Sequence, residues 1–405
     1  GMSLLAEDMR KSGDLLKVSQ TDTTAFEIGR NLATTPGKVV YQNDIFQLIQ
    51  YAPTTDKVRE VPLLIVPPWI NKFYILDLTP AKSLIKFIID QGFTVFIISW
   101  VNPDSHLSHK SFEDYMQEGI LTAADAVKRE TGVDKINVAG YCVGGTLLAT
   151  TLAYLAARGE EPFNSATFLA TQVDFTNAGD LLLFTDEDQL EALNTLMSER
   201  GYLDGSRMAN VFNMLRPRDL IWPYIVNNYL LGKKPFPFDL LYWNQDSTRM
   251  TAANHNFYLG EFYNHNRLAA GTLSIAGTRL DVHKVKLPVY ELATKEDHIA
   301  PARSVFAGAQ LFGGDVEFVL SGSGHIAGVV NPPEKMKYQF WASGKRSAKS
   351  LEQWLATAKE HPGSWWPHWA EWLAEHSGEW TIPREPGEKI GVIEDAPGAY
   401  VKTKS

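Results

Sequence analysis

The single cysteine of the chain lies in a pattern that predicts a catalytic nucleophile. Cys142 falls within Gly-Tyr-Cys-Val-Gly-Gly at 140–145, between an apolar strand-like run at 135–139 and a helix-like run at 146–153. Glycines on both sides of a nucleophile permit the tight, strained strand-to-helix turn called a nucleophile elbow, here with sulfur in place of the usual serine oxygen. The positive end of the following helix stabilises a thiolate. A small buried cysteine in a glycine-rich turn is the alternative, and the whole pattern favours the nucleophile.

An activated nucleophile needs a general base, and the base needs a group that orients it. In chains with such an elbow, the acid and then the histidine follow the nucleophile, on loops after late strands. His325 follows the last predicted strand, between small residues that let its loop approach the sulfur. His298 is a rival base, but it adjoins Asp297 too closely to bridge that carboxylate and the thiol. Asp297 and Glu296 both follow the strand at 287–293, and the residues alone separate these two acids little.

An acyl-transfer site also needs backbone donors for the oxyanion that forms at the carbonyl. The N–H of Val143, directly after the nucleophile, is the first candidate. The second comes from the loop 67–71, Pro-Pro-Trp-Ile-Asn, which follows a strand at 61–66 and offers the N–H of Trp69 or Ile70. A rigid proline turn is the structural interpretation of the same loop, and it is compatible with this role.

The elements around these residues alternate between strands and helices, which predicts a mostly parallel sheet of the α/β-hydrolase fold. The last predicted strand is expected to complete the sheet. Strands are expected at 45–51, 61–66, 93–100, 135–140, 166–171, 287–293 and 316–320, and helices at 76–91, 111–131 and 302–312.

The alternation stops after Asp174, and this predicts an insertion. Residues 175–270 have a mainly helical pattern rich in Asn, Leu and aromatic residues, as expected of a cap over the active site. The catalytic core then comprises two parts, preceded by a loosely held stub and followed by a tail. A tryptophan-rich segment within the second part is expected to pack against the surface of the fold. The stub spans 1–25, the core parts 26–174 and 271–385, the tail 386–405, and the tryptophan segment 365–369.

Composition excludes several other functions. The net charge of -9 and the lack of a basic face argue against a nucleic-acid partner. The sequence has no apolar stretch long enough to span a bilayer and no signal peptide at its beginning. One cysteine forms neither an intrachain disulfide nor a multi-cysteine zinc site. We therefore expect a cytoplasmic protein with a reduced thiol and no bound metal.

Longer motifs make the chain resemble the polyhydroxyalkanoate synthases, most of all those of class I, the short-chain type. The resemblance extends in order over nearly all of residues 25–385. Together the motifs are highly specific, whereas the elbow alone is not. They are Gly-Tyr-Cys-Val-Gly-Gly-Thr at 140–146, Pro-Pro-Trp-Ile-Asn-Lys-Phe-Tyr-Ile-Leu-Asp at 67–77, Ser-Trp-Val-Asn-Pro-Asp at 99–104, Asp-Lys-Ile-Asn-Val at 134–138, Tyr-Trp-Asn at 242–244, Glu-Asp-His-Ile-Ala-Pro at 296–301 and Gly-His-Ile-Ala-Gly-Val-Val-Asn-Pro-Pro at 324–333.

The resemblance implies a function and a catalytic triad. The catalytic cysteine, aspartate and histidine of the family fall on Cys142, Asp297 and His325. Such enzymes polymerise (R)-3-hydroxyacyl-CoA, here expected to be 3-hydroxybutyryl-CoA, and release CoA; the thioester is a substrate, and no cofactor is implied. Class I members carry an N-terminal region linked to granule attachment and dimer stability, and here it is missing or short. A homodimer at the polymer granule surface is expected of the full-length protein.

Thioester chemistry suits a sulfur nucleophile, because exchange between thioesters is nearly isoenergetic and keeps the acyl group activated. Attack by the 3-hydroxyl of a second unit then gives an oxoester, which is downhill. Asp297 either orients His325 or acts with it to deprotonate that hydroxyl. The cap is expected to exclude water, which competes with the hydroxyl. CoA is polyanionic, and cationic side chains of the cap are candidates to bind it, with solvated basic turns as the equal alternative. These are Arg216, Arg218, Lys233 and Lys234.

Two other functions remain open at this point. A thioesterase or depolymerase would use the same scaffold, but such hydrolases usually carry serine in the elbow. A non-catalytic granule-associated relative would keep the fold without chemistry, and an intact triad argues against it.

Overall fold

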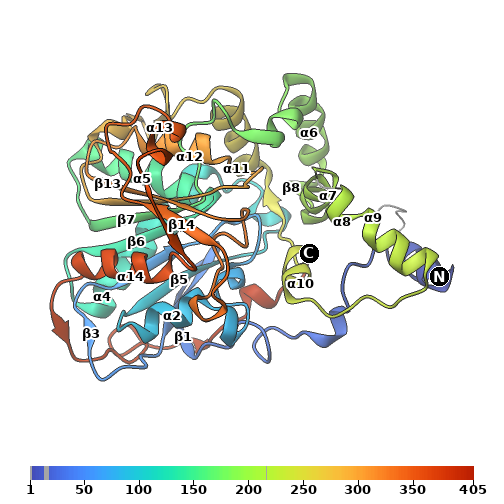
Figure 1. Cartoon of the computed structure of the whole chain (residues 1–405), viewed down its shortest axis with the longest axis horizontal. Coiled ribbons are helices and arrows are strands. Elements are labelled where there is room, and N and C mark those ends of the chain that lie inside the picture. The colour runs from blue at the N-terminus through green and yellow to red at the C-terminus, as the bar shows by residue number, and fades with distance from the viewer. Residues whose placement is uncertain (1, 13–17, 216) are drawn as a thin grey trace.

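The computed structural model describes residues 2–12, 18–215 and 217–405. An 11-stranded sheet runs through this described part (Figure 1), in the order β15-β14-β13-β12-β7-β6-β4-β5-β2-β1-β17. The strands from β13 to β5 are parallel, and those at both edges pair antiparallel. The strands are β1 (Gly37–Gln42), β2 (Phe46–Tyr51), β4 (Leu63–Val66), β5 (Val95–Trp100), β6 (Ile136–Tyr141), β7 (Phe163–Leu169), β12 (Val289–Thr294), β13 (Val316–Ser321), β14 (Gln339–Ala342), β15 (Lys359–Pro362) and β17 (Glu394–Asp395).

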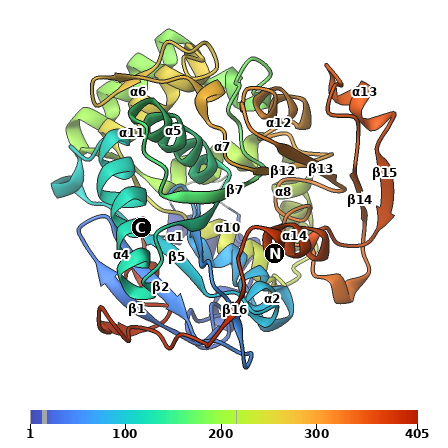
Figure 2. The same ribbon diagram turned by 90° about the vertical axis from the view of Figure 1, so that its left-hand side faces the viewer.

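The inner strands are buried on both faces, as continuous apolar runs require. Successive side chains of a strand point to opposite faces, so neighbours in β4 enter different cores. Leu64 packs with α4 and α5, and Leu63 packs with α2 and α14. Figure 2 shows these helix pairs on the two sides of the sheet. The helices are α2 (Leu84–Asp90), α4 (Thr122–Thr131), α5 (Val143–Arg158) and α14 (Trp366–Glu375), with α12 (Ala302–Ala309) beside β12 and β13.

The sheet extends further than the sequence predicts. The expectation that the strand at 316–320 completes the sheet is wrong, because β14 and β15 continue it beyond β13, and β1 and β17 extend the other edge. These strands give little sequence signal. β15 reads Lys-Glu-His-Pro and β17 reads Glu-Asp, which are polar edge strands without apolar alternation.

The helix expected at 76–91 is shorter than predicted. Two short 3₁₀ turns at Phe73–Leu76 and Pro80–Lys82 precede it, and α2 begins only after Ser83. Pro80 favours the start of a turn over the middle of a helix, because it has no backbone N–H. Ser83 accepts a hydrogen bond from the Lys86 N–H at 2.9 Å and so caps the helix.

The cap is mainly helical, as expected, and in Figure 1 its helices α6 to α9 lie together to one side of the sheet. Its predicted boundaries at 175–270 stay a prediction, and the described helices fall inside them. They are η6 (Gly179–Phe184), α6 (Glu187–Arg200), α7 (Gly205–Leu215), α8 (Pro217–Leu220), α9 (Trp222–Tyr224), η7 (Ile225–Leu230), α10 (Asp239–Gln245), α11 (Ala252–Phe257) and η8 (Tyr258–Asn264), with a small ladder of β8 (Tyr202–Leu203) and β9 (Met250–Thr251).

Both ends of the chain contact the cap (Figure 1). In the N-terminal helix α1 (Met2–Ser12), Asp8 accepts a hydrogen bond from the Tyr229 hydroxyl at 2.7 Å. At the other end, Lys404 lies 3.0 Å from Asp246, which also forms a buried ion pair with Lys72 at 2.8 Å. Asp246 therefore ties the core, the cap and the C-terminal residues together.

None of the described helices has the length and apolar character that crossing a bilayer requires.

Smaller elements complete the fold. The remaining elements are η1 (Thr23–Ala25), β3 (Val58–Arg59), η4 (Ser105–Leu107), α3 (Phe112–Asp114), η5 (Tyr115–Leu121), β10 (Ser274–Ile275), β11 (Thr278–Arg279), η9 (Val282–Lys284), η10 (Pro333–Lys335), α13 (Leu351–Leu355), β16 (Trp380–Thr381) and η11 (Tyr400–Lys402).

Candidate active site

Cys142 occupies a strained turn between β6 and α5. Its φ of 53° and ψ of -127° lie in a region that residues other than glycine rarely adopt. The glycines permit the turn, because a Cβ on Gly144 would collide with the Val66 carbonyl, and one on Gly140 would lie 2.5 Å from the Gly145 Cα. Such strain is retained where the surrounding structure enforces it, typically at functional sites. The local geometry is that of a nucleophile elbow.

His325 and Asp297 meet beside this turn, each on the loop that the sequence predicts. The Nδ1 atom of His325 lies 2.6 Å from Oδ2 of Asp297. The same carboxylate accepts the Thr294 hydroxyl at 2.8 Å through Oδ2, and the N–H groups of Ile299 and Ala300, both at 2.9 Å, through Oδ1. Four donors therefore fix the orientation of the carboxylate, and the carboxylate fixes the imidazole.

The rival residues take no part in this contact. Glu296 is exposed, and its backbone N–H donates to the Ser323 carbonyl at 2.9 Å. His298 is half-buried, and its carbonyl accepts the Asp180 N–H at 3.4 Å, at the start of the cap. The carboxylate beside His325 is that of Asp297, a choice that the residues alone left open.

The tryptophan segment at 365–369 packs against the loop that carries His325. Trp365 and Trp366 are buried, and their indole N–H groups donate to the carbonyls of Gly328 at 2.9 Å and Val329 at 2.8 Å. The tryptophans of the segment therefore pack against the rest of the fold, as expected, and contact the histidine loop, while Pro367 is exposed. The hydroxyl of Tyr141, next to the nucleophile, donates to the His325 carbonyl at 3.1 Å.

Charge couples the three side chains. Burial raises the pKa of Asp297, but the adjacent His325 and the hydrogen bonds from Ala300 and Thr294 together outweigh it, and the pKa is lowered overall. Burial likewise lowers the pKa of His325. The charge of Asp297 and the sulfur of Cys142, each of which also forms a hydrogen bond with the imidazole, raise this pKa well above its usual value. The imidazole can therefore accept the thiol proton and retain it at neutral pH.

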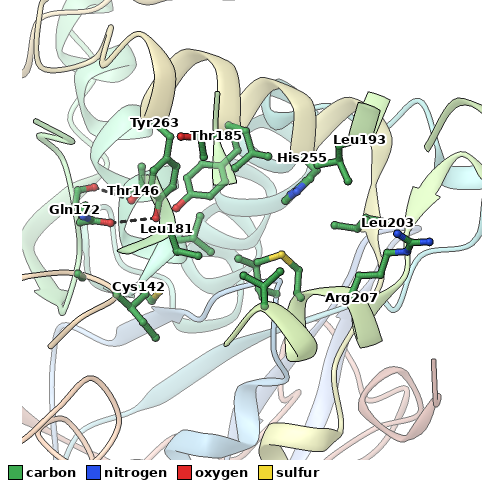
Figure 3. A pocket seen from close by; sticks show the side chains of 18 of the residues that line it. Cys142, Thr146, Gln172, Leu181, Thr185, Leu193, Leu203, Arg207, His255 and Tyr263 are labelled. Atoms are coloured by element: carbon green, nitrogen blue, oxygen red, sulfur yellow. Dashed lines mark hydrogen bonds between the residues drawn. The ribbon is translucent and has the colours of Figure 1, made fainter. Parts of the chain in front are cut away.

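A cavity of about 260 Å³ opens over Cys142, between the core and the cap. Figure 3 shows Cys142 on one side of this cavity and Arg207 on the opposite side. Most of the wall is apolar. The lining comprises Ile70, Cys142, Val143, Thr146, Ala170, Gln172, Ile299 and Ala300 from the core, and Leu181, Thr185, Gln189, Leu193, Leu203, Arg207, Met208, Val211, His255, Tyr258, Leu259 and Tyr263 from the cap.

The three candidates for the oxyanion hole lie close to one another. Val143 begins α5 and lines the cavity together with Ile70. Trp69 is only 2% exposed, and its ring packs beneath the site against Tyr258. The hydroxyl of Thr248 donates to the carbonyls of both Trp69 and Ile70, at 2.5 and 2.8 Å, and so fixes the loop. The donor role stays a prediction for all three residues, and Ile70 is the loop candidate that lines the cavity.

Of the cap cations predicted to bind CoA, those that belong to the described residues do not line the cavity. Arg218 in α8 and Lys233 and Lys234 after η7 are exposed, and Arg216 lies outside the described residues. The charged side chain in the lining is Arg207, which is also exposed. Sequence reasoning missed it, because an isolated arginine on a helix gives no signal of what it faces.

The comparisons with known proteins agree with this geometry. The sequence profile described as "alpha/beta hydrolase fold" matches residues 62–332, and the class of the protein is therefore an α/β hydrolase with a cysteine elbow. The profile described as "Poly-beta-hydroxybutyrate polymerase (PhaC) N-terminus" matches residues 1–88.

Curated relatives place the chain within a family. It is 58% identical to a poly(3-hydroxyalkanoate) polymerase of Methylorubrum extorquens, over 100% of this chain and 67% of the relative. For the corresponding subunit PhaC of Cupriavidus necator the identity is 45%, over 100% and 69%, and for polymerase 1 of Ectopseudomonas oleovorans it is 42%, over 99% and 71%. The chain belongs to the poly(3-hydroxyalkanoate) polymerases, a family of acyltransferases, and spans about two thirds of the length of these relatives.

Proposed function

We propose that the chain transfers acyl groups from (R)-3-hydroxyacyl-CoA to a growing polyester through a thioester on Cys142, with release of CoA. The observation that carries the proposal is the elbow cysteine beside the paired His325 and Asp297, at the floor of a largely apolar cavity. Membership of the polymerase family supports the same reaction.

The first step would load the acyl group onto the enzyme. Because His325 contacts Asp297 through Nδ1, its Nε2 is available to take the proton of the Cys142 thiol. The sulfur attacks the thioester carbonyl, a new carbon–sulfur bond forms, and the Val143 N–H would stabilise the oxyanion. The bond between the carbonyl carbon and the CoA sulfur then breaks, and the departing thiolate takes the proton from His325.

In the second step, the 3-hydroxyl of another unit would attack the Cys142 thioester. His325 accepts the hydroxyl proton, the ester bond forms, and the cysteine thiolate leaves. Both oxygens of Asp297 are already occupied, by two backbone N–H groups on one side and by Thr294 and His325 on the other. We therefore assign Asp297 the orienting role rather than direct contact with the substrate hydroxyl.

The substrate of this proposal is 3-hydroxybutyryl-CoA, in line with the resemblance to the class I enzymes, and CoA itself is a product rather than a resident cofactor. Exposed Arg207 at the cavity supports binding of the CoA phosphates there. Phosphate binding by Arg216, Arg218, Lys233 and Lys234 stays a prediction. Rates with 3-hydroxybutyryl-CoA and 3-hydroxyoctanoyl-CoA test the chain length.

The expected homodimer and the polymer granule belong to the same proposal. The outer cap exposes large apolar side chains, including Trp222 at 58%, Leu230 at 75% and Phe236 at 79%. Exposed large apolar side chains, where they gather on a surface, mark contacts with proteins or other apolar surfaces. Sedimentation of the wild type and of Trp222→Glu tests the dimer, which the substitution should weaken.

Product analysis tests the proposed reaction against hydrolysis. Purified protein is incubated with (R)-3-hydroxybutyryl-CoA, and both CoA and the acyl product are identified. Polyester formation supports the proposal, and free 3-hydroxybutyrate alone would make the chain a thioesterase. No turnover together with slow, ordinary thiol labelling would point to the non-catalytic alternative.

A further inference from the structure

His255 is a buried histidine of the cavity wall that the triad does not use. It belongs to α11 and is 2% exposed. Figure 3 shows its ring directed into the space between Cys142 and Arg207. Its Nδ1 atom is buried and has no hydrogen-bond partner in the described part of the chain. Buried polar groups in native proteins are nearly always paired, so a histidine that lines a cavity and carries a buried, unpaired nitrogen calls for an explanation.

The chemistry of this imidazole is that of a neutral group. Burial lowers the pKa of His255 to about 4, so the ring carries no charge at physiological pH. A neutral imidazole has one nitrogen that donates and one that accepts. It can therefore pair with a hydroxyl, which does both, or with a carbonyl oxygen, which accepts.

The neighbouring polar side chains already have partners. The amide of Gln172 accepts the Tyr263 hydroxyl at 3.4 Å and donates to Ser304 at 3.2 Å, and the Thr146 hydroxyl donates to the Gln172 carbonyl at 2.7 Å (Figure 3). The hydroxyl of Thr185 donates to the Leu182 carbonyl at 3.1 Å. Among these groups, His255 is the one with a buried polar atom that has no hydrogen-bond partner in the described part of the chain.

We propose that His255 is a specificity residue that hydrogen-bonds an oxygen of the acyl chain held at Cys142. The inference rests on the proposed function, because a 3-hydroxyacyl unit brings a hydroxyl at its third carbon, and each added unit brings an ester carbonyl. An unsubstituted acyl chain in the same cavity would offer the imidazole ring that faces the cavity no polar partner. Sites built to bond a polar group discriminate strongly against analogues that lack it.

The test compares acylation by two thioesters of equal carbon number. Burst release of CoA is measured with (R)-3-hydroxybutyryl-CoA and with butyryl-CoA, in the wild type and in His255→Phe, His255→Gln and His255→Asn. We expect a preference for the hydroxylated substrate of about tenfold or more in the wild type. Phe should remove most of it by slowing the hydroxylated substrate, while Gln, which still donates and accepts, should keep a large part.

Two controls separate specificity from damage to the fold. His265→Phe changes an exposed histidine of the same cap region and should leave the preference intact. Rates of Cys142 alkylation show whether each variant keeps its elbow; if His255→Phe is misfolded, His255→Asn takes its place. A thioester of the hydroxybutyrate dimer identifies the oxygen: loss confined to the dimer indicates the ester carbonyl, and loss with the monomer indicates the hydroxyl.

In a folded His255→Phe variant, an unchanged preference between the two monomer thioesters together with an unchanged rate with the dimer thioester would overturn the inference while leaving the proposed function standing. Absence of any CoA release from the wild type would instead refute the proposed function, and the inference with it.

Discussion

Replacing Asp297 by asparagine should stop catalysis while leaving the protein folded. The amide has the shape of the carboxylate but only one oxygen that accepts hydrogen bonds. If that oxygen keeps the N–H groups of Ile299 and Ala300, which donate at 2.9 Å, the amide NH₂ faces His325. The imidazole must then accept at Nδ1, so its proton moves to Nε2, and Nε2 can no longer take a proton from Cys142.

The expected loss follows from this wrong tautomer. An aspartate-to-asparagine change in a triad with the same arrangement lowers kcat by about 10⁴. We expect about 10³–10⁴ here, which corresponds to roughly 4–5.5 kcal/mol of transition-state stabilisation at 1.36 kcal/mol per tenfold. The assay is CoA release from (R)-3-hydroxybutyryl-CoA, with Glu296→Gln, an exposed neighbouring carboxylate, as the matched control that keeps full activity.

The pH dependence gives a second readout. In the wild type, burial lowers the pKa of His325, and Asp297 and the sulfur raise it well above 6.5. Without the carboxylate, burial has less to oppose it, so the pKa of His325 falls and the imidazole loses its proton at a lower pH than in the wild type. A neutral imidazole no longer stabilises the thiolate of Cys142 by its charge. Alkylation of Cys142 by iodoacetamide should then decline at a higher pH than in the wild type as the solution is acidified. A folded variant with less than a tenfold loss of kcat and an unshifted alkylation profile would refute the reasoning.

Two further predictions concern stability. Glu291 is buried, and both its oxygens lack partners among the described residues. Burial raises the pKa of Glu291 well above 4.5. Its contribution to the stability of the fold is therefore full below the pKa of the unfolded state and is lost as the pH rises. In urea unfolding, the stability advantage of Glu291→Gln over the wild type should therefore grow with pH above about pH 5. The slope should be about 1.4 kcal/mol per pH unit for as long as the native carboxyl stays protonated, and a constant difference would contradict this. Asp246→Asn leaves the 3%-exposed ammonium of Lys72 without its carboxylate and should cost about 3–5 kcal/mol in the same assay. Asp395→Asn removes an exposed ion pair with Lys38 and should leave the free energy of unfolding nearly unchanged.

The residues that carry chemistry could be predicted because they lie in local patterns. Cys142 stands between a buried strand and a helix, and its glycine neighbours are explained by the turn itself. Asp297 and His325 follow late strands of the same sheet, so the topology alone brings them to one edge. Asp297 and Glu296 are adjacent, so their side chains leave the loop in different directions. The choice between them depended on which one faces the histidine, and only the conformation of the loop decides that.

The cavity wall and the sheet edges could not be predicted in the same way. Leu181, Arg207 and His255 lie far apart along the chain, and nothing in their spacing says that they face one space. β15 and β17 are formed from charged residues, because an edge strand needs only one partner and can remain solvated. Their pairing depends on tertiary packing rather than on local preference.

The central claim, a thioester on Cys142, is tested most directly by trapping the acyl-enzyme. The protein is mixed with (R)-3-hydroxybutyryl-CoA, quenched in acid within the burst phase, and examined by mass spectrometry of the intact chain and of its peptides. The account predicts one or more 3-hydroxybutyryl units on the peptide that contains Cys142, cleavable by hydroxylamine and absent in Cys142→Ala. CoA release at the wild-type rate from Cys142→Ala, or an acyl group attached to another residue, would contradict it.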